Sequence, residues 1–201
     1  STNPYFIINI MKKIGILEIL FEKKVETKFF KKLLLIEKKN SLKMDQFLRF
    51  ASLAPNAKKN HLSDLKMFNF SKKDKKKLLL LTNQELKIHN KLEKNDIERI
   101  LYSINKQALV GLAILSWALS ANKIMDKEWI SILDQISKLK VPIFPLKAKD
   151  LLNFGLKEGP IIGEIFSEIE QDWIDSNFEL NKEDLLLKSK MLIGRKGHNI
   201  S

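Results

Sequence analysis

The spacing of apolar residues constrains this chain more than any other feature of its sequence. Leu, Ile, Phe and Val recur every three or four residues along nearly the whole chain, which is the period of a helix with one buried face. Only seven Gly and five Pro interrupt this pattern among 201 residues. The sequence therefore predicts an all-α fold with no substantial sheet, built as an elongated array of helices.

Helix-start signals mark several of these elements. Asn3-Pro4 places an N-cap before a proline at the first helical position, and Asp126 is a further N-cap candidate. Patterns similar to a capping box stand at Ser71–Asp74 and Asn95–Glu98, and Asn181 to Asp184 are expected to cap a last helix. We expect the last of these helices to end near residue 194.

The most apolar helix is expected to start at the Asn95 capping box and to continue without a break to Leu119. From Ala108 onward it is apolar nearly all round, which is typical of a helix buried in a core. Gly111 within it is expected to permit close approach of another helix. Further along, the two prolines of residues 141–145 predict an extended connector. The connector divides the chain into two helical subdomains, a body over residues 1–140 and a tail over residues 141–201.

Positive charge is concentrated in the first half of the chain. Residues 1–100 hold 23 Lys and Arg against 11 Asp and Glu, whereas residues 101–201 hold 13 of each. A basic half of this kind favours a polyanionic partner such as nucleic acid, because lysines that meet phosphates release condensed counterions. The alternative is an ordinary solvated surface, since 33 of the 36 basic residues are Lys. The densest cluster, residues 72–77, would then be the exposed first turns of a helix.

Several classes of site are absent from the sequence. Without cysteine, thiol nucleophiles, disulfides and cysteine-based zinc sites are impossible. His61, His89 and His198 lie too far apart for metal-ligand spacing, and the common phosphate-loop, dinucleotide, hydrolase and zinc-protease motifs do not occur. We therefore expect no catalytic and no metal-binding residues. The longest apolar run is shorter than the roughly 20 residues of a membrane-spanning helix, so the sequence predicts a cytoplasmic protein with no membrane partner.

One glycine-rich stretch, residues 145–163, carries a more specific pattern. A short helix is expected to end at Gly155, and a tight turn to pass through Gly159 before Pro160 opens a long helix. Gly163 leaves the first turn of that helix bare, and exposed amides at a helix N-terminus bind phosphate. The candidate RNA-binding residues are Lys147, Lys149, Lys157, Gly159 and Gly163. The alternative is that the glycines only allow two helices to pack closely.

The same region resembles a known family. The pattern reads Pro142-x-x-Pro145-Leu-Lys-x-x-Asp150-Leu151-Leu152-x-x-Gly155-x-x-x-Gly159-Pro160-x-x-Gly163, followed by Glu170-x-x-Trp173-Ile174-x-x-x-Phe178. It is similar to the C-terminal region of bacterial CCA-adding tRNA nucleotidyltransferases, a branch of the poly(A) polymerase family, in their alphaproteobacterial form. Weaker similarity covers Met11–Leu17 and Leu101–Ala118. Ala148 departs from the family, which commonly places Gly there.

The resemblance implies what this chain does and what it lacks. Members of the family bind magnesium and select CTP and ATP with a catalytic head, and none of the head's motifs occurs here. The chain resembles the helical body and tail, which in the family hold the elbow of tRNA. The resemblance implies tRNA as the partner and no cofactor bound by this chain. It also implies that magnesium and CTP or ATP bind to the missing head, and that this chain alone has no activity.

Two other classes of function stay open from the sequence. The chain fits a non-catalytic helical interaction protein whose apolar faces dock on a partner, such as a separately encoded catalytic head. A basic helix can also associate with an anionic membrane surface, and this reading ranks last because the apolar faces are needed for the core.

Overall fold

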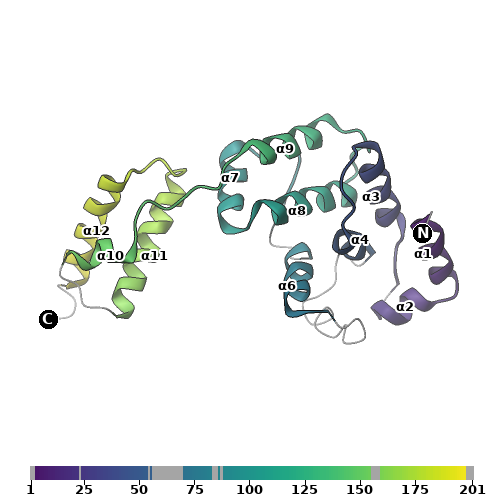
Figure 1. Ribbon diagram of the computed structural model, residues 1–201, viewed down its shortest axis with the longest axis horizontal. Helices are drawn as coiled ribbons and strands as arrows, with labels where there is room; N and C mark the ends of the chain where they lie inside the picture. Colours follow the sequence, from purple (N-terminus) through teal and green to yellow (C-terminus); the bar gives the residue numbers. More distant parts are fainter. Residues whose placement is uncertain are drawn as a thin grey trace. The chain divides into compact units, whose positions relative to one another are not determined.

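The computed structural model describes residues 3–22, 24–53, 55, 70–82, 86, 88–154 and 159–197. Throughout this part of the chain the residues form helices and connecting loops without any strand (Figure 1), so the predicted all-α fold is confirmed. The helices are α1 (Pro4–Lys13), α2 (Ile16–Phe21), α3 (Lys28–Lys39), α4 (Gln46–Leu53), α6 (Lys72–Leu81), α7 (Lys94–Ser103), α8 (Lys106–Leu119), α9 (Lys127–Lys138), α10 (Ala148–Leu152), α11 (Pro160–Asp175) and α12 (Lys182–Gly197).

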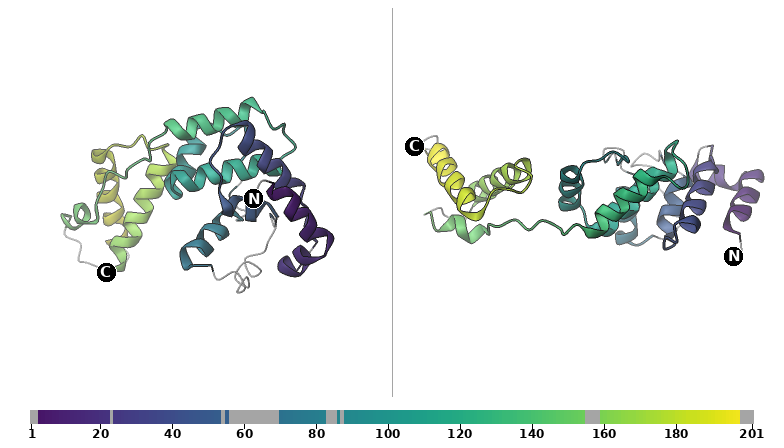
Figure 2. Two further views of the ribbon diagram at one scale, coloured as in Figure 1. Left: turned by 45° about the vertical axis from the view of Figure 1, so that its right-hand side comes forward. Right: turned by 90° about the horizontal axis from the view of Figure 1, so that it is seen from above.

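The chain divides into two compact units. Unit 1 comprises residues 1–97 and 104–139, and unit 2 comprises residues 98–103 and 140–201. The second half of α7 therefore packs with the C-terminal helices, although the sequence assigned it to the body. Each unit has its own hydrophobic core, and Figure 2 shows their helices from two further directions.

The continuous helix expected from Asn95 to Leu119 is wrong, because the chain breaks between α7 and α8. Asn105 adopts an extended conformation, and its side chain accepts a hydrogen bond from the backbone N–H of Ala108 at 2.9 Å. This N-cap starts a new helix. Helix α7 itself already begins at Lys94, so Asn95 lies inside the helix and the capping box predicted there does not form.

Helix α8 is the centre of unit 1 and contacts α3, α4, α6 and α9. The indole rings of Trp117 and Trp129 stack with centroids 6.3 Å apart, and both side chains are buried. A Cβ atom added at Gly111 would lie 3.4 Å from the side chains of both Leu48 and Leu81. Helices α4 and α6 therefore pack directly on this glycine.

Helices α1 and α2 cover a second cluster of unit 1, formed with residues of α3 and α4. The cluster buries Leu17, Phe21, Val25, Phe30 and Leu53. Helix α1 has no fully buried residue, and large apolar side chains of α1, α2 and the turn between them remain on the surface. The most exposed are Phe6 and Ile14, each at 62%, and Ile19 at 72%.

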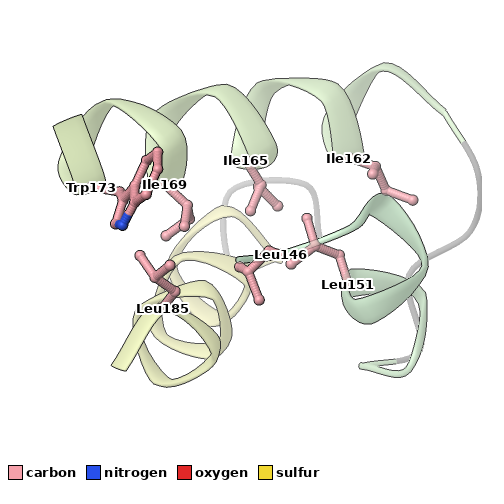
Figure 3. Close-up of a cluster of buried hydrophobic side chains, with 7 residues drawn as sticks. All are labelled: Leu146, Leu151, Ile162, Ile165, Ile169, Trp173 and Leu185. Atoms are coloured by element: carbon pink, nitrogen blue, oxygen red, sulfur yellow. The ribbon is translucent and has the colours of Figure 1, made fainter. Parts of the chain in front are cut away.

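Unit 2 is built around α11, which packs on α10 and α12. Figure 3 shows its buried cluster of Leu146, Leu151, Ile162, Ile165, Ile169, Trp173 and Leu185. The cap predicted at Asn181 to Asp184 is confirmed: the Asn181 side chain accepts from the N–H groups of Glu183 and Asp184, and the Asp184 carboxylate accepts from the N–H of Asn181. The helix it opens continues to Gly197. The end expected near residue 194 is therefore wrong, since glycine does not by itself stop a helix.

Candidate nucleic-acid interface

The glycine-rich turn stands at the start of α11. Gly159 is the N-cap residue, with φ of 166° and ψ of 179°, and no side chain of the described residues caps the helix. Pro160 occupies the first helical position as predicted. The N–H of Ile162 donates to the carbonyl of Gly159 at 3.2 Å. The described residues thus leave backbone amides of the first turn with little side-chain cover, and exposed amides at a helix N-terminus can bind phosphate.

Gly159 and Gly163 are both exposed, and no contact among the described residues requires a glycine at either position. A Cβ atom added at either glycine would meet no heavy atom of the described residues within 4 Å. The extended φ of Gly159 is also open to any residue. The alternative in which these two glycines allow helices to approach closely is therefore not supported. Gly155 and Lys157 lie outside the described residues.

Lys147 and Lys149 lie at the start of α10, and both are exposed. Figure 3 shows Leu151 of α10 beside Ile162 in the first turn of α11. Helix α10 therefore packs against the first turn of α11. Four of the five predicted site residues lie within the described chain, on two helices that pack together, and all four are exposed.

Asp150 connects the start of α10 to α12. Its carboxylate accepts the backbone N–H of Lys147 at 2.7 Å and pairs with the Lys182 ammonium of α12 at 3.0 Å. These two contacts, the backbone one first, hold the pKa of the Asp150 carboxyl below its ordinary value. Sequence reasoning missed Lys182, because nothing in the local pattern shows that α12 starts next to α10.

We expect Asp150→Asn to lower the free energy of unfolding of unit 2 at neutral pH, because Lys147 and Lys182 lose a charged partner. A depressed folded-state pKa stabilises the fold above the unfolded value of about 3.9 and stops doing so as the pH falls through the folded-state value. Urea denaturation should therefore separate wild type and variant at about pH 7 and bring them together at about pH 2. Asp134→Asn, in an exposed pair with Lys138, is the control. An equal Asp150 effect at both pH values would contradict this account.

The apolar members of the family-like pattern are structural. Trp173 is 3% exposed, and its ring lies 5.4 Å from that of Tyr102 and 4.8 Å from that of Phe178. The Tyr102 hydroxyl donates to Glu170, and burial first, then this bond, raises the pKa of Tyr102 to about 12. Tyr102, from the segment of weaker similarity, therefore shares one core with Trp173 and Phe178 of the main pattern.

The remaining carboxylates of α11 occupy surface positions. Glu164 and Glu168 are exposed. Within the described ranges, no group of three or more His, Asp or Glu residues is placed to hold a metal ion. In the same ranges no helix is long and apolar enough to cross a membrane.

The lysines of residues 72–77 open α6. Ser71 caps the helix by accepting the N–H of Asp74 at 3.1 Å. Lys77 pairs with Asp45 at 2.6 Å. Three of these lysines line a cavity of about 500 Å³, together with the two aspartates. The local excess of positive charge at this cavity is therefore small.

Comparison with known proteins gives one short match. No family model matches the chain. Among curated proteins, the mitochondrial CCA tRNA nucleotidyltransferase 1 of Danio rerio is 33% identical over 55 residues. This match covers 27% of the chain and 13% of the zebrafish protein. The chain is thus similar, over a limited segment, to an enzyme named for CCA and tRNA.

Proposed function

We propose that this chain is the tRNA-binding helical portion of a CCA-adding tRNA nucleotidyltransferase of the bacterial type, working in the cytoplasm. The observation that carries this proposal is the identity of 33% over 55 residues with a CCA tRNA nucleotidyltransferase. The excess of 12 positive charges in residues 1–100 supports a polyanionic partner. The exposed amides and lysines at the start of α11 and α10 supply a place for phosphate.

The proposed binding is electrostatic and selective for shape. Lysine ammonium groups neutralise phosphates, and the N–H groups of the α11 turn donate to phosphate oxygens. Such contacts hold the RNA backbone without reading bases, and folded RNA is recognised largely in this way. In this scheme Lys147, Lys149, Gly159 and Gly163 contact the tRNA backbone.

Nucleotide addition needs parts that the described residues do not supply. Magnesium ions in nucleotidyl transfer are held by carboxylates, and the described residues offer no cluster that fits this role. We therefore assign magnesium, CTP and ATP to a catalytic head. The chain alone should incorporate no labelled CTP or ATP into tRNA, and incorporation would overturn this assignment.

Equilibrium binding tests the proposed function. The labelled probes are a tRNA transcript and an unstructured RNA of the same length, each titrated with the protein at fixed salt. We expect tRNA to bind at least tenfold more tightly, because the contacts depend on the folded backbone. Equal affinity for both RNAs would reject the tRNA-specific function.

Charge reversal at the glycine-rich turn should weaken this binding. We expect Lys147→Glu with Lys149→Glu to raise the Kd for tRNA by about tenfold or more, since each lysine loses a phosphate contact. The start of α10 tolerates acidic residues, which favour a helix N-terminus. The matched control is Lys140→Glu with Lys190→Glu, one exposed loop residue and one exposed helical residue of unit 2. If both pairs of substitutions weakened tRNA binding to the same extent, the glycine-rich turn would not be part of the tRNA-binding surface.

A second candidate function is docking on a separate catalytic head. The exposed apolar side chains of α1, α2 and the turn between them favour it, since exposed apolar surface can mark an interaction site. Ile14→Ser with Ile19→Ser should abolish capture of a separately produced head and leave tRNA binding intact. Ile143→Ser is the control, because Ile143 is 85% exposed on the connector. Head capture unchanged by the Ile14 and Ile19 pair would reject docking through this surface.

A further inference from the structure

A groove between α1 and α3 gathers lysines from both helices and from the loop between α2 and α3. Its volume is about 520 Å³, and helices α1 and α3 contact each other in unit 1. We call it the α1/α3 groove. Its charged lining residues are Lys12, Lys24, Glu26, Lys28, Lys31 and Lys32.

The charge of the α1/α3 groove is strongly unbalanced. Its lining holds five lysines against one carboxylate, that of Glu26. Lys28 pairs with Glu26 at 2.6 Å, and both side chains are more than half exposed. Lys28 first, and then Lys12 and Lys24 by their charge, lower the pKa of Glu26. The cavity at α6 differs, since its three lysines face two aspartates.

Two lysines of the groove are held in place by neutral partners. The Lys32 ammonium donates to the carbonyl of Ser120 at 2.6 Å, and the Lys31 ammonium lies 5.4 Å from the centre of the Tyr5 ring. Burial lowers the pKa of Lys32, while the charge of Asp126 opposes that effect. A half-buried ammonium bonded to a carbonyl costs desolvation energy that a nearby anion would offset. The arrangement is therefore suited to an anionic ligand.

We propose that the α1/α3 groove, which is formed by residues of unit 1, binds the phosphodiester backbone of an RNA strand, whereas the glycine-rich turn is formed by residues of unit 2. Lys28 and Lys32 lie one helical turn apart, about 6 Å along the axis, so successive lysines of α3 can meet successive phosphates. Lysines on opposite walls suit a strand lying in the groove, whereas a flat lipid surface reaches only projecting residues. The inference rests on the proposed RNA-binding role, but not on the turn at α11.

The test compares two matched pairs of substitutions in unit 1. Lys12→Gln with Lys24→Gln removes one lysine from the last turn of α1 and one from a loop, both on the groove. Lys39→Gln with Lys43→Gln removes one from the last turn of α3 and one from a loop, both outside it. Far-UV circular dichroism checks that both variants remain folded. The probes are labelled tRNA, a labelled oligouridine and vesicles of phosphatidylcholine with phosphatidylserine.

We expect the groove pair to raise the Kd for RNA about tenfold, and the control pair less than twofold. The dependence of log K on log salt should also become shallower by about 1.4 to 1.8, from two lost phosphate contacts. Equal effects of the two pairs would overturn the proposal. So would groove-dependent binding of the acidic vesicles without binding of RNA, or no binding of either RNA.

Two further outcomes separate this proposal from the proposed function. If the groove pair weakens tRNA binding while Lys147→Glu with Lys149→Glu does not, the groove stands and the glycine-rich turn is excluded. If oligouridine binds through the groove while tRNA does not bind, the groove stands and the tRNA-specific function fails.

Discussion

Replacing Arg49 by Ala is expected to lower the free energy of unfolding of unit 1 by about 3–5 kcal/mol. The guanidinium donates twice to one carboxylate oxygen of Glu37, at 3.0 Å from Nε and 2.7 Å from Nη2. Glu37 is only 6% exposed. Its second oxygen is buried with no hydrogen-bond partner among the described residues. Removing Arg49 would therefore leave a buried charge without compensation, which costs more than losing an exposed pair.

Two variants make this prediction specific. Lys138→Ala breaks the exposed pair of Lys138 with Asp134 and should cost less than about 1 kcal/mol. Combining Glu37→Met with Arg49→Met should recover most of the loss, because apolar residues of similar volume replace the buried pair. Chemical denaturation followed by circular dichroism measures all three. If Arg49→Ala and Lys138→Ala lowered the free energy of unfolding equally, the pair of Arg49 with Glu37 would not behave as a buried ion pair.

Replacing Trp173 by Ala is expected to lower the free energy of unfolding of unit 2 by about 3–5 kcal/mol. The indole is buried and contacts the rings of Tyr102, Phe144 and Phe178, with centroids 4.8 to 5.4 Å away. Since these rings join α11 to α7 and to the connector, truncation should loosen unit 2 as a whole. The glycine-rich turn would lose its support, and tRNA binding should weaken as a result.

A conservative replacement separates packing from hydrogen bonding at this site. The indole N–H of Trp173 is buried without a partner among the described residues. Trp173→Phe keeps an aromatic ring and removes this unsatisfied donor, so it should cost clearly less than Trp173→Ala. Phe6→Ala, at a residue that is 62% exposed, is a control for loss of a ring. If Trp173→Phe and Trp173→Ala lowered the free energy of unfolding equally, packing of the aromatic ring would not explain the stabilisation.

The sequence predicts the start of a helix correctly where a neighbouring side chain caps the first turn. The N-caps at Asn3, Asp126 and Asn181 form as expected, with side-chain oxygens accepting backbone N–H groups. The break before Asn105 was missed, since the apolar period continues across it and only the cap conformation shows the new start. Helix α12 likewise continues past Gly194, because an open glycine weakens a helix without ending it.

The contacts within the candidate site depend on tertiary packing, which the sequence pattern does not show. The exposure of Lys147, Lys149, Gly159 and Gly163 agrees with their place between apolar positions of the pattern. The link from Asp150 to Lys182 could not be predicted, because α12 begins about 30 residues later and its packing sets the contact. The α1/α3 groove was missed for the same reason. Its lysines come from separate elements, and the sequence showed only their total charge.

The measurement that tests the central claim most directly is the salt dependence of tRNA binding by the intact chain. Each phosphate neutralised by a lysine contributes about 0.7 to 0.9 to the negative slope of log K against log salt. With contacts at both the glycine-rich turn and the α1/α3 groove, we predict four or more neutralised phosphates and a slope steeper than about −3. A slope near zero would contradict the account, because the positive helical surface would then take no part in holding RNA.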